Sequence, residues 1–331
     1  MSKSVNLPFE VPVFASSQLL AAASIAMTGH PTAFNQVLHQ TSSIFCTTKF
    51  LQGFTTPQVT IPYSRMEYFS FIEWYPMSFR FTKGEYINII KRMLEEGFYV
   101  YYDGVDDYYL PNKSWYGTRH MVHDGIVCGY DEADGTLSIA AHDINWVFRL
   151  IRIPITSFEV AVKESFKLYP NAHYRAYRVK EDTDVEFNEK EVLKNLKIHM
   201  DSDFTKYPVE TATNACGTIV HEYIAMYLDK LLDGSIPYEK MDWRALRPVW
   251  EHKKCMLMRI RAVEEKLGWD SALGDAYMSV VDKANRVRMA YAVYHRKRRD
   301  SMLEGIRNDL LEVGKQDRQL VGEFINKLER V

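Results

Sequence analysis

Apolar residues recur with two different periods along this chain, and the change of period divides the chain into a strand-rich part and a helical part. Four short runs, at 98–104, 125–131, 136–143 and 146–155, are rich in β-branched and aromatic residues. Such runs are typical of strands, and the turn at 132–135 predicts that the middle two form a hairpin. This half of the chain therefore predicts an antiparallel sheet.

Helical spacing marks the remaining segments. Residues 82–97 place their apolar side chains on one face, with a capping box at the start and a glycine at the end, and 16–29 has the pattern of a short buried helix. From about residue 185 strand signals fade and helical spacing dominates. The last such stretch, 270–331, is too long for one unbroken helix, and Gly305 and Gly314 are candidate interruptions.

These patterns predict the α+β class and two domains. The first, residues 1–165, would be an antiparallel sheet with helices, and the second, residues 166–331, would be α-helical. A chain of 331 residues is long enough for one large or two modest domains.

The composition restricts the kinds of partner and the cellular compartment that we expect for this protein. Hydrophobic residues make up 47% of the chain, charged residues 25%, and the net charge is −2, which gives no reason to expect a nucleic-acid or membrane partner. The four cysteines lack disulfide or metal spacing, as in proteins of reducing compartments, so we expect a cytoplasmic protein. No phosphate-binding loop or dinucleotide fingerprint occurs, and we expect no cofactor.

Candidate chemistry lies in the predicted hairpin. His123 opens one strand and Asp143 ends the next, so antiparallel pairing would bring them side by side. A carboxylate beside an imidazole fixes its tautomer and stabilises the imidazolium formed during proton transfer. Such a pair needs a serine or cysteine nucleophile from a helix N-terminus. The alternative is a hydrogen-bonded surface hairpin without catalytic function.

The hairpin also carries a family resemblance. His123, the apolar run after it, Gly129-Tyr130-Asp131 and then Asp143 resemble the papain-like fold of double-glycine leader peptidases. The chain is more similar to papain-fold proteins of natural-product gene clusters, such as the butirosin side-chain acyltransferase and the closthioamide amide synthase. Residues 97–131 and 244–260 resemble uncharacterised proteins encoded near nonribosomal peptide synthetase genes, so the resemblance covers most of the chain.

The resemblance implies acyl transfer from a carrier-protein thioester to a small-molecule amine, or hydrolysis of that thioester, in peptide or polyketide assembly. His123 would be the general base and Asp143 would orient it. The nucleophilic cysteine of the family is absent here, and Ser17 occupies its place. Cys46 is the other candidate nucleophile, and Gln18 would help to bind the oxyanion.

Three alternatives remain open. The missing cysteine would suit an inactive papain-like scaffold that binds a carrier or synthetase partner. A metal site could use the ligands His120, His123, Asp124, His142 and Asp143. The basic run at 295–299 is typical of a solvated helix face, but it would also complement an acidic carrier protein.

Overall fold

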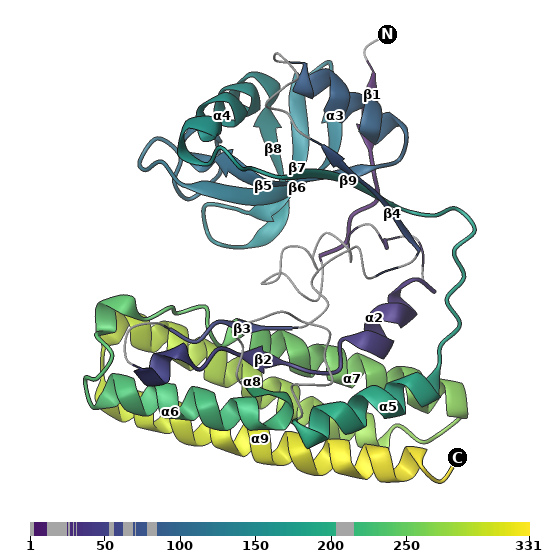
Figure 1. Ribbon diagram of the computed structural model, residues 1–331, viewed down its shortest axis with the longest axis vertical. Coiled ribbons are helices and arrows are strands. Elements are labelled where there is room, and N and C mark those ends of the chain that lie inside the picture. Colours follow the sequence, from purple (N-terminus) through teal and green to yellow (C-terminus); the bar gives the residue numbers. More distant parts are fainter. Residues whose placement is uncertain are drawn as a thin grey trace. The chain divides into compact units, whose positions relative to one another are not determined.

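The computed structural model describes residues 3–11, 25, 27–28, 30, 32–52, 56–61, 69, 71–77, 85–202 and 215–331 (Figure 1). The chain divides into two compact units. A sheet unit comprises Met1–Phe34 and Arg65–Asp184, and a helical unit comprises Asn35–Ser64 and Val185–Val331. The fold is therefore α+β, with a sheet domain followed by a helical C-terminal region.

Antiparallel pairing builds the sheet unit. The strands are β1 (Ser4–Asn6), β4 (Ile72–Met77), β5 (Tyr99–Asp106), β6 (Val122–Asp131), β7 (Thr136–His142), β8 (Phe148–Pro154) and β9 (Tyr174–Val179). Their order is β4-β9-β5-β6-β7-β8, and β1 pairs with β6. The four predicted strands are confirmed as β5 to β8.

Among the described residues of this unit, two helices cover one face of the sheet. They are α3 (Tyr86–Glu95) and α4 (Ile155–Leu168), and the short 3-10 helix η4 (Asp107–Tyr109) follows β5 directly. Tyr102 of β5 packs edge-on against Phe158 of α4, with 5.5 Å between the ring centroids. The apolar side chains of this face form a core with α3 and α4, which is why the amphipathic helices lie there. Gly97, at φ +82°, ends the α3 segment as its sequence predicts.

A β-bulge in β5 positions the candidate chemistry. The pairing of β5 with β6 shifts between Tyr102 and Val105, so that Val105 lies opposite His123. Bulges bend a strand and redirect the side chains beyond them. Asp106 and Asp107 follow this bulge, and the end of β5 thus reaches the start of β6.

Long helices make up most of the second unit. They are α2 (Phe34–Gln40), α5 (Glu189–Asp201), α6 (Val220–Leu232), α7 (Arg247–Leu267), α8 (Ala272–Lys297) and α9 (Asp300–Leu328), with the 3-10 helices η1 (Lys49–Gln52), η6 (Gly217–Ile219) and η7 (Tyr238–Lys240). A small antiparallel sheet, β10-β2-β3, consists of Ala215–Cys216, Phe45–Cys46 and Val59–Thr60. No helix in the described part of the chain is long and apolar enough to cross a membrane.

The domain boundary differs from the expected one at residue 165. Strand β9, at 174–179, pairs with both β4 and β5, so the sheet unit continues to Asp184. Residues 35–64 belong to the helical unit, because Phe45 and Cys46 pair with Cys216 and Ala215. Two long-range strand pairings therefore set the division, and neither follows from local periodicity.

The long C-terminal helical pattern breaks at a position the sequence did not indicate. Arg298, at φ +50°, ends α8, and α9 begins at Asp300 and continues through Gly305 and Gly314. Gly314 is buried and packs against His221, whereas Gly305 is exposed with no neighbour within 4 Å of an added Cβ. The expected interruption at these glycines is wrong, because one serves close packing and the other is simply tolerated.

These two glycines give a matched pair of substitutions on one helix. Gly305→Ala should raise the free energy of unfolding by about 0.5–1 kcal/mol, since alanine is the better helix former. Gly314→Ala should lower it by about 1–3 kcal/mol, because the new methyl group would lie 2.8 Å from Cβ and Cγ of His221. Urea unfolding followed by circular dichroism measures both, and equal effects at the two positions would contradict the described packing.

Candidate active site

A buried carboxylate of η4, directly after β5, lies beside the candidate catalytic histidine. Asp107 Oδ2 lies 2.6 Å from Nδ1 of His123, at the start of β6. Asp107 Oδ1 lies 3.5 Å from Nζ of Lys113, and both of these side chains are almost completely buried. A buried carboxylate needs such compensation, because leaving it unpaired in the interior is strongly unfavourable.

This arrangement leaves the second nitrogen of His123 available for chemistry. A carboxylate accepts, so Nδ1 of His123 donates to Asp107, and in the neutral imidazole Nε2 then carries the lone pair. The His123 side chain is 27% exposed, which is partial access to solvent. An oriented imidazole with partial access to solvent is the arrangement that a general base requires.

Asp143, the carboxylate expected beside His123, has other partners. Its Oδ1 accepts the backbone N–H groups of Asn145 at 2.8 Å and Val147 at 2.9 Å, and its Oδ2 lies 2.5 Å from Arg149. The described ladder between β6 and β7 ends at the pair of Ile126 and Ala140. Asp107, and not Asp143 as expected, therefore orients His123, because the backbone N–H groups of the 143–147 loop and Arg149 occupy the Asp143 carboxylate.

Aromatic side chains border His123. The ring of Trp146 lies edge-on to the imidazole, with centroids 6.3 Å apart, and Trp115 packs edge-on against Trp146 at the same distance. Trp146 adopts φ +60°, an unusual conformation for a bulky residue, and the Oγ of Ser114 donates to the Asp143 carbonyl at 3.0 Å. The segment after β5 and the loop after β7 thus meet beside His123, and they give the site an apolar border.

A second histidine–aspartate pair lies next to the first. His120 Nδ1 lies 2.7 Å from Oδ2 of Asp106, and the His120 ring stacks on Tyr108 with centroids 4.2 Å apart. Asp106 Oδ1 also accepts the backbone N–H groups of Tyr108 and Met121, each at 3.1 Å. Asp106 therefore fixes the backbone on both sides of this loop, and the pair with His120 is part of that structural role.

Of the two candidate nucleophiles, only Cys46 lies among the described residues. Ser17, together with the oxyanion candidate Gln18, lies outside the described residues. Cys46 belongs to β2 of the helical unit, where it is fully buried in the apolar core. Burial raises the pKa of the Cys46 thiol to about 12, so the thiol stays protonated at neutral pH. Cys46 has the properties of a core residue.

The geometry does not support the alternative in which these residues bind a metal ion. His123 and Asp124 are neighbours on β6, so their side chains point to opposite faces of the sheet. Burial raises the pKa of Asp124 to about 7, against the lowering effect of His123 and Lys113. Across the described ranges, no group of three or more His, Cys, Asp or Glu side chains is arranged to hold a metal ion.

The helical unit contains a second buried charge cluster that sequence reasoning missed. Asp317 of α9 lies 2.7 Å from Nζ of Lys253 and 3.6 Å from Nε2 of His199, and it accepts a hydrogen bond from the Tyr277 hydroxyl. All four side chains are buried. One signal was available: Lys253 falls four residues after Val249 and three before Met256, in the phase of the buried face of α7.

Comparisons of the chain with protein-family models and with curated proteins give no match. The chemical meaning of the site therefore rests on its own geometry.

The hydrogen bonds and the ion pair of Asp143 should make the stability of the fold depend on pH. Burial alone would raise the Asp143 pKa, but the N–H groups of Val147 and Asn145 and the charge of Arg149 hold it below its usual value. Ionised Asp143 thus stabilises the fold at pH values above about 3.9, the pKa of an aspartate in the unfolded chain. This contribution disappears as the pH falls through the lower pKa that Asp143 has in the folded protein. Asp143→Asn should cost about 1–3 kcal/mol at pH 7 and progressively less below about pH 4.

Chemical denaturation at several pH values measures this difference. The control is Asp134→Asn, which breaks an exposed ion pair with Arg152 on the same hairpin and should change stability little. A cost for Asp143→Asn that does not depend on pH would show that the ionised form is not what stabilises the loop.

Proposed function

We propose that the sheet unit catalyses acyl transfer, with His123 as general base and acid and Asp107 as its positioning residue. The observation that supports this most is the 2.6 Å hydrogen bond from Nδ1 of His123 to a buried carboxylate, which leaves Nε2 able to accept a proton. The substrate in this proposal is an acyl thioester on a carrier protein, and the product is an amide or a free acid.

Ser17 is the nucleophile in this proposal. His123 Nε2 takes the proton of the Ser17 hydroxyl while its oxygen attacks the thioester carbonyl, and the imidazolium then returns the proton to the departing thiolate. An amine or water next attacks the resulting ester, again losing its proton to Nε2, and the serine hydroxyl is restored. The Asp107 carboxylate stabilises the imidazolium at both steps, and Gln18 would help to bind the oxyanion.

Substrate preference in this proposal follows from the border of the site. Trp115 and Trp146 lie next to His123, and Tyr116, Ile144 and Val147 are exposed large apolar side chains of the same two loops. Aromatic and aliphatic surface of this kind gains free energy by covering an apolar acyl group. We therefore propose apolar acyl groups as preferred donors.

The alternative function is a scaffold that binds a carrier or synthetase partner without covalent chemistry. The burial of Cys46 in the core of the helical unit favours it, because one of the two candidate nucleophiles is then inert. Covalent catalysis would depend on Ser17 alone.

Intact-protein mass spectrometry after incubation with small and carrier-bound acyl thioesters distinguishes the two functions. Wild type should form an acyl adduct that Ser17→Ala lacks. His123→Gln should slow acylation by about 10²–10⁴-fold, since proton transfer contributes a factor of this size. Asp107→Asn should slow it by about 10²-fold or more, through loss of the oriented tautomer.

The matched control is His120→Gln, which removes the neighbouring histidine of the same loop and should leave the acylation rate nearly unchanged. Circular dichroism of each variant separates a lost fold from lost chemistry. No adduct and no turnover across the whole thioester panel would reject catalysis in favour of the scaffold. An adduct whose rate is insensitive to His123→Gln would reject His123 as the base.

A further inference from the structure

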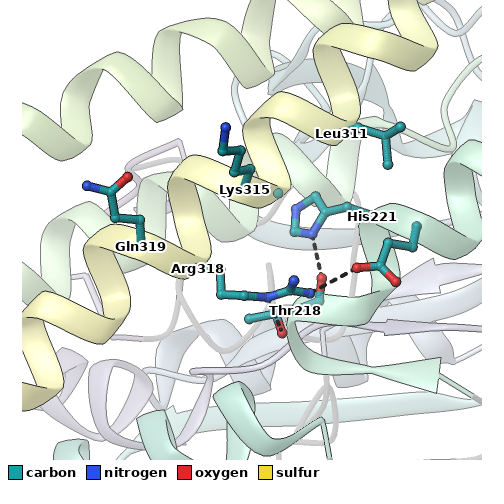
Figure 2. A pocket seen from close by; sticks show the side chains of 8 residues that line it. Thr218, His221, Leu311, Lys315, Arg318 and Gln319 are labelled. Atoms are coloured by element: carbon teal, nitrogen blue, oxygen red, sulfur yellow. Dashed lines mark hydrogen bonds and ion pairs between the residues drawn. The ribbon is translucent and has the colours of Figure 1, made fainter.

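A pocket of about 350 Å³ lies between helices α6 and α9 within the helical unit (Figure 2). This volume is at the lower end of the range for small-molecule sites. Its lining includes Thr218 of η6, His221 and Glu222 of α6, and Gly314, Lys315 and Arg318 of α9. Nothing in the proposed acyl transfer uses these residues.

One of the polar residues that line the pocket is His221, whose side chain is almost completely buried. Its Nδ1 lies 3.0 Å from the carbonyl oxygen of Thr218, and since a carbonyl only accepts, Nδ1 carries the proton. Nε2 is then an acceptor, and it has no hydrogen-bond partner among the described residues. Figure 2 shows the imidazole between Thr218 and Lys315. A buried acceptor without a partner is unfavourable, so a ligand that donates a hydrogen bond would satisfy it.

The surroundings of His221 specify a neutral donor. Burial, followed by the charge of Lys253, lowers the pKa of His221 to about 3, so the imidazole is uncharged at neutral pH. An ammonium group at Nε2 would meet the same cost of burial. A hydroxyl group donates without bringing a charge, so it is the donor that fits.

The rim of the pocket favours an anion. Arg318 Nη2 donates to Glu222 Oε1 at 3.0 Å, which neutralises both side chains, and Arg318 Nε lies 3.4 Å from Oγ1 of Thr218. Lys315 is exposed one turn earlier on α9 and has no ion pair in the described part of the chain. The rim therefore carries one uncompensated positive charge, at Lys315.

We propose that this pocket binds a small hydroxy acid. The hydroxyl of the ligand donates to Nε2 of His221, and its carboxylate or phosphate lies at Lys315. Gly314 lets the imidazole lie directly against α9, since an added Cβ would lie 2.8 Å from Cβ and Cγ of His221.

Titration of ¹⁵N-histidine-labelled protein with lactate, glycerate and glycerol 3-phosphate tests this proposal, with propionate as the matched anion that lacks the hydroxyl. At least one hydroxy anion should shift the Nε2 resonance of His221 saturably. Propionate should bind about tenfold more weakly than lactate, as expected for one lost hydrogen bond to a buried acceptor. His221→Phe should remove the preference for lactate over propionate.

The charge at the rim is tested separately. Lys315→Gln, at an exposed position, should weaken binding by about three- to tenfold, as expected for one charge contact. Lys327→Gln, twelve residues and about 18 Å further along the same helix, is the control and should leave binding unchanged. Thermal unfolding of each variant reports whether the fold is intact.

Two outcomes would overturn the proposal. One is the absence of any saturable His221 shift with all three hydroxy anions up to about 50 mM, a limit above the weakest affinity expected for such a site. The other is equal binding of lactate and propionate by the wild type. Equal losses in Lys315→Gln and Lys327→Gln would reject Lys315 as the anion contact.

Discussion

A buried carboxylate must find positive charge and hydrogen-bond donors inside the protein, and this constraint shapes both units. Asp107 finds His123 and Lys113 in the sheet unit. Asp317 finds Lys253 and His199 in the helical unit. Removing one partner of such a buried pair costs about 3–5 kcal/mol, because the other charge is left without compensation. In each unit, a buried aspartate therefore fixes the positions of side chains from several elements.

The same constraint explains why two aspartates near His123 have separate functions. The tight 143–147 loop places two backbone N–H groups and Arg149 around Asp143, which occupies its oxygens. Asp107 comes after the bulge in β5 and faces the imidazole instead. Which carboxylate orients the histidine thus depends on where the backbone donors lie.

Local periodicity predicted strands β5 to β8, helix α3 and the helical character of the chain after about residue 185, because these elements bury one regular face. It did not predict β9, whose pairing with β4 and β5 is long-range, nor the contribution of residues 35–64 to the helical unit. Asp107 was not identifiable as the partner of His123, since Asp106 and Asp107 are adjacent and only the bulge decides which of them faces which histidine. His123 itself was identifiable, because it opens a strand that an acidic residue could reach.

The proposed acyl transfer depends on the tautomer of His123, and histidine NMR measures it directly. Long-range ¹H–¹⁵N spectra of wild type should show His123 protonated at Nδ1, with the downfield proton shift of a hydrogen bond to a carboxylate. This signal should be lost or move upfield in Asp107→Asn and stay in place in Asp143→Asn. A signal that survives Asp107→Asn but disappears in Asp143→Asn would contradict the account.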